Sequence, residues 1–145
     1  MKKYILLLML TALIAAPSLA QTNISGSLSG TLGPGTFVLS GDALVAYNDS
    51  LIIAPGTTIY GRTGNAIAVF GYIHIAGTET DSVVMVSETP QNWWDGLDFK
   101  PSASDNCLVE YLYIADCETH GVDFYGCSPT IRHSTIFNSS DDSSC

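Results

Sequence analysis

Basic side chains are scarce in this sequence. Its 145 residues include five Lys and Arg against fourteen Asp and Glu, which gives a formal net charge of −9. Lys2 and Lys3 lie at the very start, so residues 21–145 keep three basic side chains against all fourteen acids, a net charge of −11. A chain this acidic repels phosphate backbones, which argues against nucleic acid as a partner.

Amphipathic helical patterns and long apolar runs are also missing after residue 20. Short runs of Ile, Val, Phe and Tyr are separated instead by Gly, Ser, Thr, Asp and Asn, which is typical of β-strands joined by turns. No stretch after residue 20 approaches the ~20 apolar residues that span a membrane. The composition therefore predicts one small all-β domain with no membrane span.

Residues 1–20 have the features of a secretory signal peptide. Lys2 and Lys3 precede an apolar stretch over residues 4–16, and Pro17-Ser18-Leu19-Ala20 supplies a small-residue cleavage site. The stretch is too short to cross a membrane comfortably. No Cys lies near the cleavage site, so a lipid anchor is not expected. We therefore expect cleavage before Gln21 and a protein that is secreted or held at the cell surface.

Two segments near the end of the chain, residues 106–116 and 128–138, repeat each other. This alignment places Val109 on Ile131, and a second echo at a slightly longer offset places residues 96–99 on residues 121–124. Repeats of this length made of short apolar strands predict a coiled stack of parallel strands, each pairing with its equivalent one coil away.

The repeat also predicts which side chains share a column on the stack. Glu110 falls on Arg132, so the two are expected to form an exposed ion pair. Asp98 and Asp123 should lie together on the outer face, because they alternate with side chains that we expect to point inward: Leu97, Phe99, Val122 and Phe124.

The chain then divides into four parts. We expect a signal peptide at 1–20, a Gly/Ser-rich lead-in and N-terminal cap at 21–35, four to five coils at 36–138 and a polar tail at 139–145. The first strand is expected at residues 36–39. No capping helix follows the last coil, so we expect a C-terminus truncated relative to a longer parent and an open coil able to self-associate.

At this point several segments resemble the opening coils of a known family. Residues 53–59 (IAPGTTI), 68–78 (AVFGYIHIAGT), 84–87 (VMVS) and 94–97 (WDGL) are similar to right-handed parallel β-helix proteins of the pectate-lyase-like superfamily. The resemblance covers about residues 27–139 and points to large secreted repeat proteins of bacteria. It implies an all-β, right-handed parallel β-helix.

The resemblance is specific for the fold and unspecific for activity, since the superfamily includes lyases, hydrolases and adhesins. The preferred interpretation is a non-catalytic extracellular scaffold or binding module that contacts polysaccharides or surface proteins. The alternative is the N-terminal part of a polysaccharide lyase or glycoside hydrolase whose active site lies in further coils. We predict no catalytic residues in this chain, because no lyase-like or hydrolase-like motif matches.

Three acids form the candidate metal site. A lyase of this superfamily would hold Ca²⁺ on an outward carboxylate cluster, and Asp95, Asp98 and Asp123 are the residues here that could supply one, with oxygen ligands that suit this ion. The preferred interpretation is solvated carboxylates without a cofactor, because their mutual repulsion in water is only ~1 kcal/mol.

Two aromatic residues form the candidate glycan platform. Trp93 and Trp94 could stack on sugar rings, but we favour one Trp filling the core at a corner while the other shields the stack.

Four cysteines lie in the last third of the chain. Secretion and an even count favour disulfides, but the repeat places no Cys directly over another. Free thiols and bridges therefore both remain open for Cys107, Cys117, Cys127 and Cys145.

Overall fold

The computed structural model describes residues 21–118 and 120–139. Within these residues the protein has fourteen β-strands and no helix. The strands are β1 (Thr22–Ser27), β2 (Gly30–Leu32), β3 (Gly35–Val45), β4 (Ser50–Ile53), β5 (Thr57–Gly61), β6 (Ala66–Val69), β7 (Tyr72–Ala76), β8 (Val83–Ser87), β9 (Gly96–Phe99), β10 (Leu108–Glu110), β11 (Leu112–Cys117), β12 (Val122–Phe124), β13 (Thr130–Arg132) and β14 (Thr135–Ser139).

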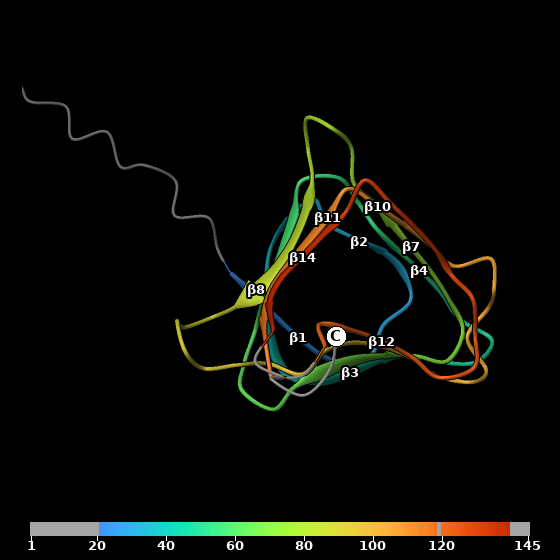
Figure 1. Ribbon diagram of the computed structural model, residues 1–145, viewed down its shortest axis with the longest axis horizontal. Coiled ribbons are helices and arrows are strands. Elements are labelled where there is room, and N and C mark those ends of the chain that lie inside the picture. The colour runs from blue at the N-terminus through green and yellow to red at the C-terminus, as the bar shows by residue number, and fades with distance from the viewer. Residues whose placement is uncertain (1–20, 119, 140–145) are drawn as a thin grey trace, which may run out of the picture.

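The strands lie in three stacks around a triangular outline (Figure 1). Stack 1 is the five-stranded sheet β2-β4-β7-β10-β13. The nine-stranded sheet turns a corner within β3, whose first part pairs with β5 and whose last part pairs with β6. Stack 2 therefore continues from β3 through β5, β8, β11 and β14, and stack 3 continues through β6, β9 and β12. The result is a nearly closed, barrel-like arrangement of parallel strands.

The register of these strands confirms the predicted columns. Val109 pairs with Ile131 and Ile114 with Ile136, at the shorter of the two predicted offsets. The residues of β12 pair with those of β9 at the longer offset, so that Asp98 lies beside Asp123. The period read from the sequence is thus the spacing at which parallel strands hydrogen-bond.

The core lies inside the triangle. Side chains alternate between buried and partly exposed along β5, β7 and β8, as expected for strands with one face inward. Like residues meet across strands, and a ladder of Ile59, Met85 and Ile114 is fully buried. Fully buried large side chains also include Trp94, Phe99, Leu97 and Ile67.

One expectation about a single segment was wrong. The first strand begins at Thr22 rather than at residue 36, because residues 21–35 form β1 and β2. Phe124 lies in the column of Phe99, as expected, with the ring centroids 5.4 Å apart. It is 47% exposed, since no further strand of stack 3 covers it among the described residues.

Two predictions from the sequence fall outside the described part of the chain, namely the signal peptide at 1–20 and the tail beyond Ser139. Within the part that is described, no helix has the length and hydropathy needed to cross a membrane.

Candidate functional site

The predicted acidic cluster lies on the outer face of stack 3. Asp98 of β9 and Asp123 of β12 are adjacent in the parallel register and are partly exposed. Asp95 precedes β9, and the three carboxylates line one surface hollow together with Glu118 and Tyr125. We call this set of five residues the acidic hollow. The structure thus brings together all three acids that the sequence singled out.

Each of the two stacked aspartates has a basic partner. Lys100 Nζ lies 2.8 Å from Asp98 Oδ2, and His120 Nδ1 lies 2.9 Å from Asp123 Oδ1. The Lys100 ammonium is also 4.9 Å from the centre of the Tyr125 ring, within reach of a cation–π contact. The Lys100 charge offsets part of the repulsion between the aspartates, and both partners hold the carboxylates in place.

Asp95 is partly buried and lies beside another carboxyl group of the hollow. Burial raises the pKa of Asp95, and so do the nearby charge of Glu118 and a hydrogen bond with that side chain. Glu118 approaches because Trp94 and Cys117 form a parallel bridge, which places the next residue of each segment side by side. A carboxyl pair of this kind holds a proton more readily than an ordinary surface acid.

The sequence did not single out Glu118. The offset that aligns β9 with β12 places Asp95 over His120, whereas the bridge pairs Trp94 with Cys117 at a shorter offset. The cause is an insertion, since the segment between Cys117 and Gly121 is longer than the segment between Trp94 and Gly96. An alignment at the shorter offset, which places Trp94 on Cys117, would have put Asp95 beside Glu118.

The acids of this hollow do not converge on one point. Within residues 21–118 and 120–139, no group of three or more His, Cys, Asp or Glu side chains is placed to hold a metal ion. The carboxylates of Asp98 and Asp123 are directed instead to Lys100 and His120.

The two tryptophans have different environments. Trp94 is completely buried, and its Nε1–H donates to the carbonyl oxygen of Ala115 at 3.0 Å. A Cβ atom at Gly61 would collide with the Trp94 ring, so the ring lies directly against that backbone. Trp93 is partly exposed. A two-ring glycan platform is therefore not formed, because Trp94 belongs to the core.

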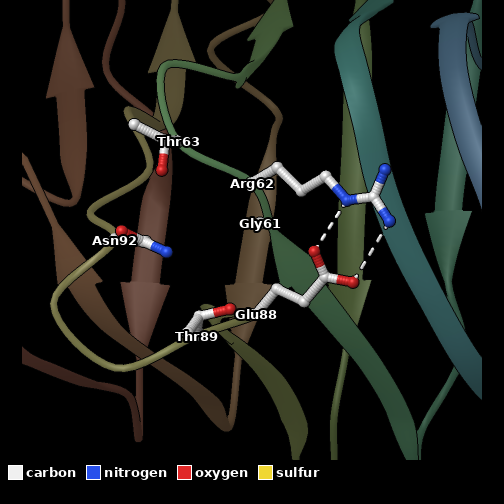
Figure 2. Close-up of a pocket in the computed structure, with 6 residues that line it drawn as sticks. All are labelled: Gly61, Arg62, Thr63, Glu88, Thr89 and Asn92. Carbon is white, nitrogen blue, oxygen red and sulfur yellow. Dashed lines mark hydrogen bonds and ion pairs between the residues drawn. The ribbon is translucent and has the colours of Figure 1, made fainter.

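A second hollow lies beside the corner where β5 ends (Figure 2). It is lined by Gly61, Arg62, Thr63, Glu88, Thr89 and Asn92. Arg62 and Glu88 face each other with two parallel bonds of 2.6 and 3.2 Å. The Arg62 guanidinium lowers the pKa of Glu88 through this hydrogen bonding. Since each charge is already satisfied by the other, the pair connects β5 to the end of β8 and leaves only neutral polar groups for a ligand.

The predicted ion pair on stack 1 is present. Arg132 Nη2 lies 2.7 Å from Glu110 Oε1, and His74 Nε2 lies 3.0 Å from the other oxygen of the same carboxylate. Hydrogen bonds from both partners lower the pKa of Glu110, with His74 the larger cause. On the same stack, the rings of His133 and Tyr111 lie on each other with centroids 4.7 Å apart.

The cysteines that the structure describes are free thiols. Cys107 and Cys117 are buried and Cys127 is partly exposed. Burial raises the pKa of Cys117 to about 12, so this thiol is a packing residue and a poor nucleophile. Cys145 lies outside the described residues.

Comparison with known protein families, with curated proteins and with solved structures finds no match to this chain.

Proposed function

We propose that this protein is an extracellular right-handed parallel β-helix, of the pectate-lyase-like class, that acts as a binding module for a neutral polysaccharide. The fold part of the proposal is supported by three stacks of parallel strands, in which each strand pairs with its equivalent from the next coil. The extracellular location is supported by the signal-like sequence of residues 1–20.

The acidic hollow is the observation that carries the binding function. Oxygens of fixed carboxylates accept hydrogen bonds from pairs of sugar hydroxyls, and charge-assisted bonds of this kind are the stronger ones. Tyr125 is 49% exposed at the rim, where its ring offers an apolar face to the C–H surface of a sugar. Aromatic stacking and carboxylate acceptors in one hollow suit a polyhydroxylated ligand.

The negative charge of the acidic hollow determines which class of polysaccharide we expect to bind. Four carboxyl groups line the hollow, with Lys100 as the neighbouring cation. Uronic acids or sulfated sugars would bring further negative charge to this surface, which like-charge repulsion disfavours. We therefore expect neutral glycans to bind in preference to acidic ones.

Retention on immobilised polysaccharides tests this function. The chain is expected to be retained by at least one neutral polysaccharide, and the substitution Tyr125→Ala is expected to weaken retention at least about fivefold, a typical loss for one stacking contact. Tyr47→Ala is the matched control, since Tyr47 is 68% exposed and lies outside the acidic hollow. Equal effects of the two substitutions would contradict the proposal. Binding to surface proteins without retention on any polysaccharide would contradict it as well.

One observation favours a carbohydrate-active enzyme as the second candidate. The raised pKa of Asp95 beside another carboxyl group resembles the tuning of a general acid. Glycosidases, however, separate their two carboxyl groups by roughly 5–9.5 Å to admit the sugar or a water, whereas Asp95 and Glu118 share a hydrogen bond. Release of reducing sugar that disappears in Asp95→Asn would favour the enzyme over the binding module.

A further inference from the structure

We propose that the outer face of stack 2 is a second binding site for the neutral polysaccharide, separate from the acidic hollow on stack 3. The class of ligand rests on the proposed function. The site itself is supported by the charge and chemistry of its side chains, by a polar hollow at its edge and by the two loops beside it.

Two columns of uncharged side chains cover the outer face of stack 2. Tyr60 lies beside Val86 in the parallel register, and Thr58 and Tyr113 lie on either side of Val84. All five side chains are at least partly exposed, Tyr113 to 39%, because they alternate with buried residues of the same strands. We call these five residues the stack 2 face. It offers two phenol rings, a hydroxyl group and apolar surface, but no charge.

The outer faces of the other two stacks carry charged side chains. Glu110 and Arg132 lie on stack 1, and Asp98 and Asp123 lie on stack 3. The stack 2 face differs because it offers no partner to a charge on a ligand. A charged ligand would therefore lose hydration there without compensation. A neutral sugar, in contrast, has C–H surface that phenol rings can cover.

The Arg62–Glu88 ion pair lies at the edge of the stack 2 face. Arg62 follows Tyr60 by two positions and Glu88 follows Val86 by two, so the pair lies on the same side of the sheet. The two charges satisfy each other through their parallel bonds. The hollow in Figure 2 lies beside this pair, so the uncharged face continues into a group of polar side chains.

Three neutral side chains of this hollow can bind sugar hydroxyls. Thr63 and Thr89 each have a hydroxyl group and Asn92 has an amide, and none of these side chains has a hydrogen-bond partner within residues 21–118 and 120–139. The Ser87 hydroxyl lies within hydrogen-bond distance of the carbonyl oxygens of Thr89 and Asn92, which holds their loop in place. Apolar surface beside a few prepositioned polar groups is the usual composition of a ligand site.

Two loops stand on either side of the stack 2 face. Residues 77–82 precede β8 and residues 88–95 follow it, and both loops project beyond the triangular outline (Figure 1). Strands of five residues, such as β5 and β8, are only about 17 Å long. A flat partner as wide as a second copy of this chain would meet the loops before it reached the face. A single polysaccharide chain is narrower and can lie along the stack, crossing β5, β8 and β11 in turn.

Retention of the full chain on immobilised amylose, cellulose and galactomannan tests the proposal. On each polysaccharide that retains the wild-type chain, Tyr113→Ala should weaken retention at least about fivefold, as for one stacking contact. Asn92→Ala should weaken it about threefold through the loss of one hydrogen bond, and its exposed loop position leaves the core intact. Tyr47→Ala is the matched control and should leave retention unchanged, because Tyr47 is 68% exposed and belongs to neither site.

Comparison with Tyr125→Ala separates the two sites. An immobilised polysaccharide presents chains on all sides of the molecule, so both sites engage at once and the two losses should multiply in the double variant. Weakening by Tyr113→Ala but not by Tyr125→Ala would support this site and contradict binding at the acidic hollow. The reverse result would overturn this site and leave the proposed function standing.

Two further results would overturn the proposal. Retention by none of the three polysaccharides would exclude this site together with the proposed function. A dimer in sedimentation velocity that Tyr113→Ala dissociates, with retention unaltered, would assign the stack 2 face to a second copy of this chain.

Discussion

The two ends of the strand stacks differ in how far they cover the core side chains. At the N-terminal end, β1 pairs with both parts of β3, across the corner between stacks 2 and 3. Ile24 is thereby buried, and Leu28 and Leu32 pack against the core from the connecting segment and β2. At the opposite end, which among the described residues is formed by β12, β13 and β14 and is called here the C-terminal end, Phe124 and Ile136 occupy inward columns and are half exposed.

The difference shows that side chains in the inward columns are buried only where a further strand or segment packs over them. Residues 21–35 contain no charged side chain and are rich in Gly, Ser and Thr, so β1 can turn the corner closely over β3. The C-terminal strands have the apolar columns without such a layer among the described residues. Among the described residues, the same side-chain pattern is therefore buried at one end and half exposed at the other.

The largest expected effect is the difference in stability loss between alanine substitutions at two phenylalanines of one column. Phe99→Ala should lower the free energy of unfolding by about 3–5 kcal/mol, because Phe99 is fully buried. Phe124→Ala should cost roughly 1 kcal/mol, because much of that ring is already solvated. Urea unfolding followed by circular dichroism, at concentrations where the chain is monomeric, measures both. Similar losses would mean that the C-terminal end is covered.

The two ends can be compared directly through two isoleucines. Ile24→Ala is expected to cost about 2–4 kcal/mol, as for a buried aliphatic side chain. Ile136→Ala should cost roughly 1 kcal/mol in the monomer, since Ile136 is 47% exposed. The same urea titration applies, and a greater loss for Ile136 would reverse the contrast between the ends.

Between the ends, Gly61 tests how tightly the interior is packed. Gly61→Ala should lower stability by about 1–3 kcal/mol, because the added Cβ would collide with the rigid Trp94 ring. Gly41→Ala is the control, since its Cβ would meet Ser25 at 3.4 Å, an ordinary contact. Tryptophan fluorescence during unfolding should report the change at Trp94, and equal stabilities of the two variants would argue against the close contact.

Near the C-terminal end, Asp95→Asn should stabilise the protein at neutral pH by about 0.2–1 kcal/mol, the scale of one like-charge contact. The folded protein has a pKa for Asp95 above the ordinary 3.8, so its charge destabilises the fold at pH values above that raised pKa. As the pH falls through the raised value toward 3.8 this cost disappears. Melting temperatures of both proteins should therefore converge with falling pH; parallel curves would contradict the pair with Glu118.

The smallest expected effect is a difference in labelling rate among the cysteine thiols, which does not affect stability. Cys127 should react first with iodoacetamide among the three described thiols, because it is partly exposed near the open end. Burial raises the pKa of all three thiols, so the order of labelling depends on exposure, and Cys107 and Cys117 are buried. Peptide mapping by mass spectrometry separates these sites from Cys145. Faster labelling of Cys117 would show that the interior opens readily.

The repeat predicted much of the fold because strand pairing here follows sequence offsets. Glu110 lies beside Arg132 and Asp98 beside Asp123, as the two offsets of the repeat required. Asp98 and Asp123 of the acidic hollow were predicted for the same reason, and Asp95 was predicted from its place near the start of the same coil. Glu118 and Tyr125 were missed, since the insertion before Gly121 shifts the register and exposure of Tyr125 depends on the end of the stack.

The sequence by itself determined the period of the strands and the side of each strand that faces inward. Both are local properties, because side chains alternate along a strand and like residues recur at a constant offset. Only the tertiary structure decided that Trp94 lies against Gly61, that Asp95 meets Glu118, and that among the described residues Ile24 is buried while Ile136 is half exposed. These depend on which segment lies over a given column, and that contact is made by residues far away along the chain.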